Sequence, residues 1–181
     1  APSPPVTEGA TYDQHPAAMA FATDLAERRH LDPSWVRAQI GQARRLDRAI
    51  RLVMPPPKGQ PKNWAAYRAR FIEPRRLQAG LRFWQTHREA LDKAEATYGV
   101  PASLIVGVIG VETLYGEHLG NFRVLDTLVT LAFDFPAAHP RAEARAAFFR
   151  DELEQFLSLT HRAGIEPASL RGSYAGAMGW P

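Results

Sequence analysis

An apolar run that ends in a single carboxylate is the sequence feature that most constrains the fold. Between positions 102 and 111 the only polar side chain is Ser103, and Glu112 follows directly. Pro101 suits the first turn of a helix, and Gly116 suits the position just past its end. Because apolar residues surround this predicted helix on all sides, we expect it to be buried.

The position of Glu112 on this helix indicates a functional carboxylate. Glu112 follows Leu104 and Val108 at helical spacing, so it shares their face. Burial and the helix C-terminus both disfavour a negative charge, and both would raise the pKa of Glu112. A buried acid that keeps its proton suits general acid catalysis. The alternative is a structural core glutamate that is hydrogen-bonded to the backbone or to an arginine.

Composition excludes several classes of site. The 181 residues suit one domain or two small lobes, and 45% of them are hydrophobic, which is enough for a core. Cysteine is absent, which rules out disulfides, thiolate catalysis and cysteine-bound metals. The histidines show no metal-binding spacing, so neither a metal nor another cofactor is expected.

Charge and hydropathy indicate which classes of binding partner are not expected. The net charge is only +3, and no block of like charges forms a nucleic-acid-binding arm, so no nucleic acid is expected. No stretch approaches the ~20 uninterrupted apolar residues of a membrane-spanning helix.

Most of the chain has helical patterning, and no convincing strand is found. We expect a flexible, proline-rich linker at 1–15 and a rigid connection at 55–59. Helices are expected at 15–29, 33–52 with a break near Gly41, 64–71, 74–98, 125–132 and 141–160. The fold class is therefore mainly α.

The end of the chain is rich in glycine. Gly172, Gly176 and Gly179 allow a backbone to pass close to a neighbour, yet the sequence stops at Pro181. A glycine-rich loop at a terminus has little reason to be ordered. We therefore expect residues 16–181 to form a domain that lacks its C-terminal part.

Seven short motifs occur in an order and at spacings that are specific to one family. They are PPPKG at 55–59, YRARFIEP at 67–74, YGVP at 98–101, IGVET at 109–113, RVLDTL at 123–128, FRDELEQFL at 149–157 and GSYAGAMG at 172–179. In these motifs the chain resembles the lytic murein transglycosylases of the membrane-bound B and soluble B type.

The resemblance implies a fold, a reaction and a set of site residues. The fold would be a lysozyme-like helical lobe with additional N-terminal helices. The enzyme would cleave the MurNAc–GlcNAc bond of peptidoglycan and close a 1,6-anhydro ring on the muramic acid. Glu112 would be the single catalytic acid. The substrate-binding residues would be Ser173, Tyr67, Arg145, Phe148, Gly176 and Met178, with Arg141 competing with Arg145 for its role.

Ordinary glycosidases use two carboxylates. The other acidic residues of this chain, however, are predicted to lie at solvated or structural positions rather than in an apolar environment like that of Glu112. Glu117 is predicted to be solvated, Asp126 to start a helix and Asp134 to lie in a turn. Asp151, Glu152 and Glu154 are predicted to form a solvated helix face. Two other functions stay open, a non-catalytic peptidoglycan-binding or scaffold module and a lysozyme-like muramidase that uses water.

The resemblance also implies partners and a location. The ligand would be the glycan strands of peptidoglycan. Cell-wall synthesis or division proteins and the C-terminal remainder of the same protein would be further partners. The location would be the periplasm, with an outer-membrane lipoprotein as the form before processing.

Overall fold

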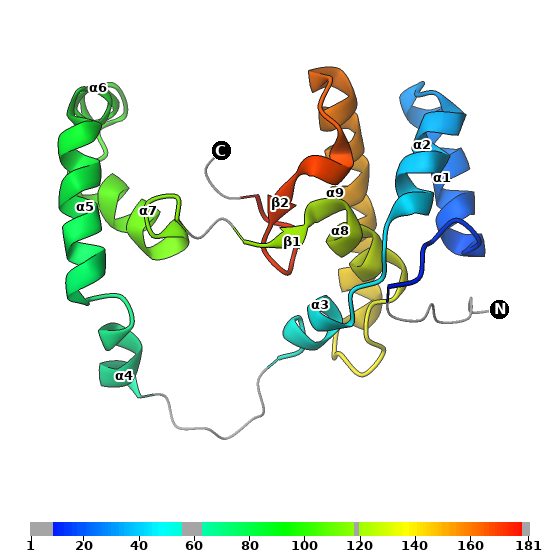
Figure 1. Cartoon of the computed structure of the whole chain (residues 1–181), viewed down its shortest axis with the longest axis horizontal. Coiled ribbons are helices and arrows are strands. Elements are labelled where there is room, and N and C mark those ends of the chain that lie inside the picture. The colour runs from blue at the N-terminus through cyan, green and yellow to red at the C-terminus, as the bar shows by residue number, and fades with distance from the viewer. Residues whose placement is uncertain (1–8, 56–62, 118–119, 179–181) are drawn as a thin grey trace. The chain divides into compact units, whose positions relative to one another are not determined.

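The computed structural model describes residues 9–55, 63–117 and 120–178. These residues form two compact units (Figure 1). The first unit consists of residues 9–55 and 120–178, and the second of residues 63–117. The range 16–181, which was expected to form one domain, is thus divided. Most of the predicted connection at 55–59 lies outside the described residues.

The first unit is built from helices whose starts are encoded locally. Asp32 accepts a hydrogen bond from the Trp35 amide at 2.8 Å and Pro33 fills the first turn, as predicted. The His15 side chain caps the preceding helix in the same way. The elements are α1 (Pro16–Arg29), α2 (Pro33–Gln42), α3 (Asp47–Leu52), α8 (Val124–Phe133), α9 (Ala142–Ala163) and the short 3₁₀ helix η1 (Pro167–Ser169).

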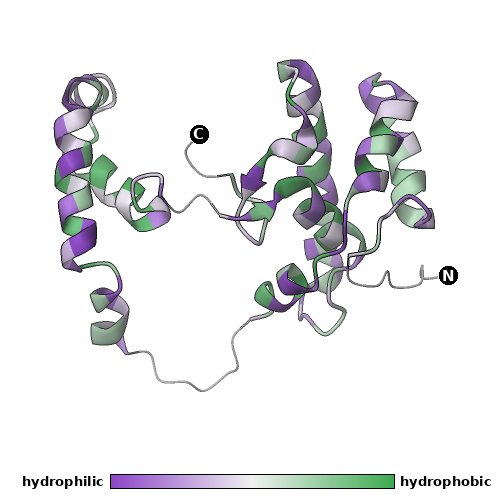
Figure 2. Cartoon of the chain, viewed as in Figure 1, coloured by the Kyte–Doolittle hydropathy of each residue, from purple (hydrophilic) through white to green (hydrophobic). Residues whose placement is uncertain are grey.

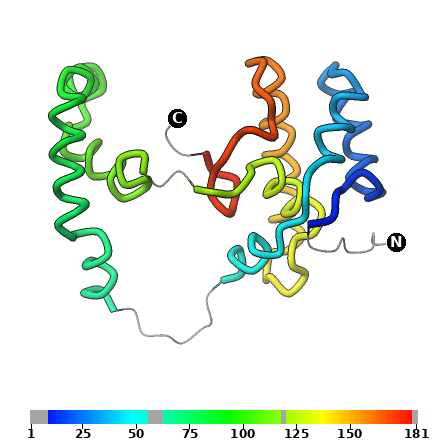
Figure 3. The backbone as a smooth tube through the Cα atoms, viewed as in Figure 1, coloured from blue at the N-terminus to red at the C-terminus, as the bar shows by residue number. Residues whose placement is uncertain are grey.

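Helix α8 is the centre of the first unit. Its residues from Val124 to Ala132 are all buried, and α9, α1, α2 and α3 pack around it. Segments from both halves of the chain therefore lie side by side in this unit (Figure 3). The core contains Leu25 and Ile40 from the N-terminal helices and Phe149 and Leu153 from α9. Burial of this apolar surface is the main source of stability for the unit.

Residues 9–15 are attached to this core through the buried side chains of Tyr12 and His15, so the linker prediction is wrong for them. Tyr12 is fully buried, and its hydroxyl donates a hydrogen bond to Asp134 Oδ2 at 2.6 Å. Thr11 also forms an isolated β-bridge with Arg44. The proline-rich composition favoured a flexible linker, and the burial of Tyr12 was not predicted from it. The rest of the predicted linker, residues 1–8, lies outside the described part.

A short antiparallel ribbon corrects the prediction that the chain has no strand. Strand β1 (Phe122–Arg123) pairs with β2 (Arg171–Gly172), with Phe122 opposite Gly172. Two-residue strands are too short to show a detectable alternation of polar and apolar residues, so they could not be predicted from the sequence. Gly120 has φ +88° and lies against the Gly172 carbonyl, which leaves no space for a Cβ atom. The ribbon attaches the 172–178 segment to the start of α8.

The second unit contains α4 (Trp64–Ala69), α5 (Pro74–Thr86), α6 (Arg88–Tyr98) and α7 (Ala102–Thr113). The predicted helix 74–98 is broken at His87, whose φ of −110° and ψ of 22° are not helical. Gly99 ends α6 in the left-handed conformation, as predicted. A small core of Leu91, Ala102 and Val106 joins α6 to α7.

Helix α7 is only partly buried, which contradicts the prediction from its composition. Figure 2 shows hydrophobic residues along the helix. Yet Leu104 and Val108 are 60% and 61% exposed, and Val111 is exposed as well. Val106 and Gly110 face inward. The apolar composition of α7 favours burial, but the packing of α5 and α6 against it leaves part of its surface exposed.

Among the described residues, no single helix is long and apolar enough to cross a membrane. The pair α6 and α7 reaches that length and composition only when taken together, and it is bent by 115°.

Candidate active site

Glu112 lies in the last turn of α7, and its side chain is exposed in the second unit. The expected desolvation of this carboxylate is therefore wrong for this unit. In the described part of the chain Glu112 forms no hydrogen bond or ion pair with another residue. The carboxylate is held at a defined helix end but is free to meet a ligand.

The turn after Glu112 has an unusual backbone. Leu114 and Tyr115 are consecutive non-glycine residues with positive φ, at 49° and 57°. Each such residue costs of order 1–3 kcal/mol, so the surrounding structure must hold the turn in place. The Tyr115 hydroxyl lies against Gly80 and Gly110, where an added Cβ would come within 2.5 and 2.3 Å of it. These two glycines make the room that the turn needs.

Arg76 connects the Glu112 helix to Tyr67. Its guanidinium donates a hydrogen bond to the Gly110 carbonyl, two residues before Glu112. The same group lies 5.4 Å from the centre of the Phe71 ring, which contacts the Tyr67 ring at 5.0 Å. Tyr67 is half exposed. The second unit therefore joins both of its predicted site residues through one chain of contacts.

The Ser173 hydroxyl organises the loop 172–178 in the first unit. Its Oγ accepts hydrogen bonds from the amides of Ala175 and Ala177, at 3.2 and 3.1 Å. The Ser173 amide donates to the Ala177 carbonyl at 2.8 Å. A hydroxyl oxygen has two lone pairs and one proton. Because both lone pairs are occupied, the hydroxyl of Ser173 is left as a donor.

Two glycines fix this loop on α8. Gly176 has φ +81°, and a Cβ there would come within 2.7 Å of Leu128. At Gly172 a Cβ would meet the Ala177 carbonyl oxygen at 2.6 Å. The GSYAGAMG motif is therefore rich in small residues because the loop packs against itself and against α8.

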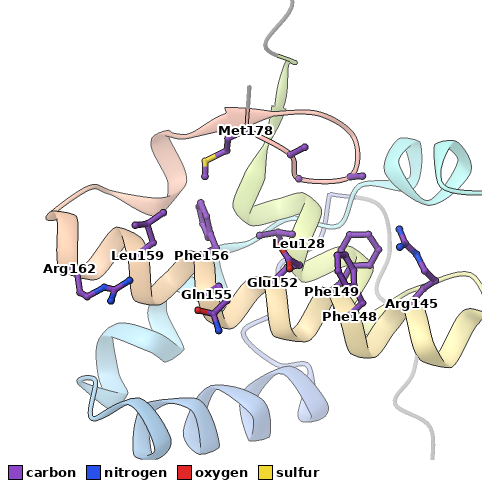
Figure 4. A pocket seen from close by; sticks show the side chains of 13 residues that line it. Leu128, Arg145, Phe148, Phe149, Glu152, Gln155, Phe156, Leu159, Arg162 and Met178 are labelled. Carbon is purple, nitrogen blue, oxygen red and sulfur yellow. The ribbon is translucent and has the colours of Figure 1, made fainter. Parts of the chain in front are cut away.

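A groove of about 560 Å³ lies between this loop and α9. Figure 4 shows Met178 above α9 and the Arg145 side chain at the opposite end of the groove. The Arg145 guanidinium lies over Phe148 at 5.1 Å and over Phe149 at 5.0 Å, a cation–π arrangement. The groove thus brings together four predicted residues, Arg145, Phe148, Gly176 and Met178. Arg141 does not line it.

Residues 13–181 match the family model for the transglycosylase SLT domain. The chain belongs to the transglycosylase SLT domain family. Membrane-bound lytic murein transglycosylase B of Escherichia coli K12 is 37% identical over 180 residues, which cover 95% of this chain and 48% of that protein.

Solved structures of this family agree. The E. coli lytic transglycosylase Slt35, in complex with bulgecin A, has a TM-score of 0.82 and 38% identity over 95% of this chain and 52% of its own. Soluble lytic transglycosylase SltB1 of Pseudomonas aeruginosa has a TM-score of 0.80 and 39% identity over 91% and 52%. SltB3 of P. aeruginosa, solved with NAG-NAM-pentapeptide, shares the fold at 23% identity. The chain spans about half the length of these relatives.

Two other carboxylates of this SLT domain, Asp126 and Glu117, have structural partners. Asp126 is buried in the first turn of α8 and accepts the Arg44 amide at 2.9 Å, and Arg123 lies 2.9 Å away. Burial raises the pKa of Asp126, although its two partners oppose this. Glu117 pairs with Arg75 at 2.5 Å and is exposed, as predicted.

Glu154 corrects the prediction of a solvated face. It is buried and contacts Arg28 at 2.7 Å and Arg29 at 2.5 Å, both from α1. Its burial favours the neutral form, but hydrogen bonds from the two guanidinium groups outweigh that effect and lower the pKa of Glu154. Asp151 and Glu152 are exposed, as predicted.

Sequence reasoning missed most of the residues that line the groove. Those it did not single out include Leu128, Gln155, Phe156, Leu159 and Arg162. Positions 148, 152, 155, 159 and 162 follow one another at steps of four and three, which is one face of a helix. Extending that spacing from Phe148 would have found the α9 side of the groove. In the described ranges no group of histidine, aspartate and glutamate side chains could hold a metal ion.

Proposed function

We propose that the chain supplies the catalytic acid and part of the substrate groove of a lytic transglycosylase that cleaves the MurNAc–GlcNAc bond of peptidoglycan. One observation carries the proposal: Glu112 is an exposed carboxylate that has no partner among the described residues, at the end of α7 and directly before a strained turn. Strained backbone next to a free acid is a frequent property of active sites. Family membership supplies the class of reaction.

In the proposed mechanism one carboxyl group serves twice. The Glu112 carboxyl protonates the leaving oxygen of the GlcNAc as the bond from that oxygen to the muramic C1 breaks. The resulting carboxylate then takes the proton of the muramic 6-hydroxyl while that oxygen bonds to C1. The proton returns to Glu112, no water is consumed, and a 1,6-anhydro ring is the product. The N-acetyl group of the substrate would share the positive charge that develops at C1.

We assign Ser173 a positioning role in this reaction. Its oxygen is occupied by two backbone amides, so its proton is available to an acceptor oxygen of the bound sugar. Arg145 and Phe148 would contact the substrate in the groove of the first unit, and Tyr67 is proposed as a further substrate-binding residue in the second unit.

A muramidase that uses water is the second candidate, because Glu152 lines the groove and could activate a water molecule. We place the protein in the cell envelope, with peptidoglycan strands as its ligand. The periplasm, a lipid-anchored precursor and contacts with cell-wall synthesis or division proteins belong to this proposal.

The test compares Glu112→Gln with Glu117→Gln in the intact protein. The amide keeps the shape of the side chain but cannot donate a carboxyl proton. We expect Glu112→Gln to lose about 10²–10⁴-fold in cleavage of purified peptidoglycan, because that is the usual contribution of general acid–base catalysis. Glu117→Gln removes the next carboxylate along the chain, which is also in the second unit, and should keep wild-type turnover.

Mass spectrometry of the products separates the functions. Anhydro and hydrated muropeptides differ by one water. Anhydro ends from the wild-type protein support the transglycosylase, and hydrated ends that also depend on Glu152 support the muramidase. Binding without any cleavage by the wild-type protein would leave a non-catalytic peptidoglycan-binding module. If the Glu112→Gln variant kept more than about a hundredth of the wild-type turnover, Glu112 would be excluded as the general acid.

A further inference from the structure

We propose that Arg162 binds the terminal carboxylate of the peptide attached to a muramic acid whose sugar lies at the Phe148 end of the groove. The proposal rests on the function above and adds a peptide-binding subsite to it. The juxtaposition that carries it is an apolar groove along α9 with the Arg162 guanidinium, which has no polar partner in the described part of the chain, at its far end.

The far end of the groove has the chemistry of a peptide site. Phe156, Leu159 and Met178 give it an apolar lining, and Gln155 adds an amide that can both donate and accept hydrogen bonds. Figure 4 shows Arg162 beyond Leu159, at the opposite end of α9 from Arg145. An apolar wall with a few polar groups is the usual composition of a ligand site.

The charge at this end is unpaired. Within the described ranges Arg162 forms no ion pair or hydrogen bond with another residue. Arg145, in contrast, is already stacked on two phenylalanine rings. Between them Glu152 carries the opposite charge, so the groove is not a uniformly cationic surface. A carboxylate is therefore attracted at the Arg162 end, where a bidentate contact is available.

The length of the groove suits a short peptide. From Phe148 to Arg162 the helix advances 14 residues, which is about 21 Å at 1.5 Å per residue. Five extended residues reach about 17 Å. The long side chain of arginine spans the remainder. A pentapeptide that starts at a sugar near Phe148 therefore ends within reach of Arg162.

The experiment measures binding, so it does not depend on turnover. The probes are GlcNAc–MurNAc-pentapeptide and the same compound with its terminal carboxylate converted to an amide. Neither contains the MurNAc–GlcNAc bond that is cleaved. Calorimetric titration of the wild-type protein should give a dissociation constant about three- to tenfold lower for the acid than for the amide, as expected for a partly exposed ion pair with hydrogen bonds.

Two variants assign the preference to a residue. Arg162→Gln should bind acid and amide equally, with its affinity for the amide unchanged. Arg51→Gln is the matched control, because Arg51 is also an exposed cation in the last turn of a helix of the same unit and does not line the groove. It should keep the wild-type preference.

Three outcomes overturn the proposal: equal binding of acid and amide by the wild-type protein, an unchanged preference in Arg162→Gln, or no binding of either probe. Cleavage of glycan strands to anhydro products is measured separately, so any of these results leaves the proposed transglycosylase reaction to stand or fall by its own test.

Discussion

Single backbone positions determine the shape of the loop above the groove. Gly176 combines a positive φ of 81° with a contact that excludes a Cβ atom, because Leu128 is buried directly beneath it. An alanine at this position would destabilise the fold in two ways, because it would have to adopt the left-handed conformation and would also displace Leu128. The loop carries the Ser173 hydroxyl, so this packing bears on the site as well as on stability.

We expect Gly176→Ala to lower the stability of the first unit by about 1–3 kcal/mol and to weaken binding of peptidoglycan fragments. Gly164→Ala is the matched control, since Gly164 also has a positive φ, 65°, but no atom within 4 Å of an added Cβ. It should show the conformational cost alone and unchanged binding. Thermal unfolding and titration measure the two effects. Equal losses for both variants would show that the Leu128 contact is unimportant.

Helix α9 shows how one element serves core and site at once. Its inward face, with Phe149, Leu153 and Leu157, packs into the core, while Phe148 and Arg162 lie on the face toward the groove. Glu154 lies on neither face and joins α9 to α1 through Arg28 and Arg29. This ion-pair cluster holds the N-terminal helix against the helix that forms the groove wall.

The Glu154 cluster predicts a dependence of stability on pH. Because the folded protein holds the pKa of Glu154 below its ordinary value of 4.5, its contribution is complete above that pH and is lost as the pH falls through the folded value. Glu154→Gln should therefore unfold about 1–2 kcal/mol more easily at pH 7 and match the wild-type protein in strong acid.

The control for Glu154→Gln is Asp24→Asn, which breaks only the exposed pair with Arg28. It should change stability by less than about 0.5 kcal/mol. Denaturant titrations at a series of pH values provide the measurement. A difference between Glu154→Gln and the wild-type protein that stayed constant into acid would refute the role of the ionised carboxylate.

The elements that could be predicted from sequence are those with local signals. Asp32 and Pro33 mark the start of α2, and Gly99 marks the end of α6, because caps and left-handed residues act within one turn. The burial of Glu154 and the exposure of Leu104 could not be predicted, since both depend on which distant helix packs alongside. The helix break at His87 could not be predicted either, because no proline or glycine lies at that position.

The site divides in the same way. Glu112 could be proposed because a lone carboxylate after an apolar run is rare. Ser173 could be proposed because it lies in one of the seven motifs, and Arg145 because of the family resemblance alone. The physical reason given for Glu112, desolvation, does not hold in its unit, where the residue is exposed. Arg162 belongs to none of the motifs, so its position in the groove along α9 is known only from the structure.

At the scale of the whole molecule, the two units have separate cores of different size. The first buries a large continuous cluster that includes Leu153, whereas the main cluster of the second is Leu91, Ala102 and Val106. A region with few buried apolar contacts opens with less free energy than a large core. The second unit, which carries Glu112, should therefore be the first to open.

Paired core truncations test this independence. Leu91→Ala should speed amide hydrogen exchange in α5, α6 and α7 while exchange in α8 and α9 stays at the wild-type rate. Leu153→Ala should do the reverse, and each should cost about 2–5 kcal/mol in its own unit because a buried leucine leaves a cavity. Exchange followed by mass spectrometry on peptides from each unit gives the pattern. Faster exchange in both units after either single change would mean that the two cores unfold as one, so that the Glu112 helix and the groove share a single cooperative structure.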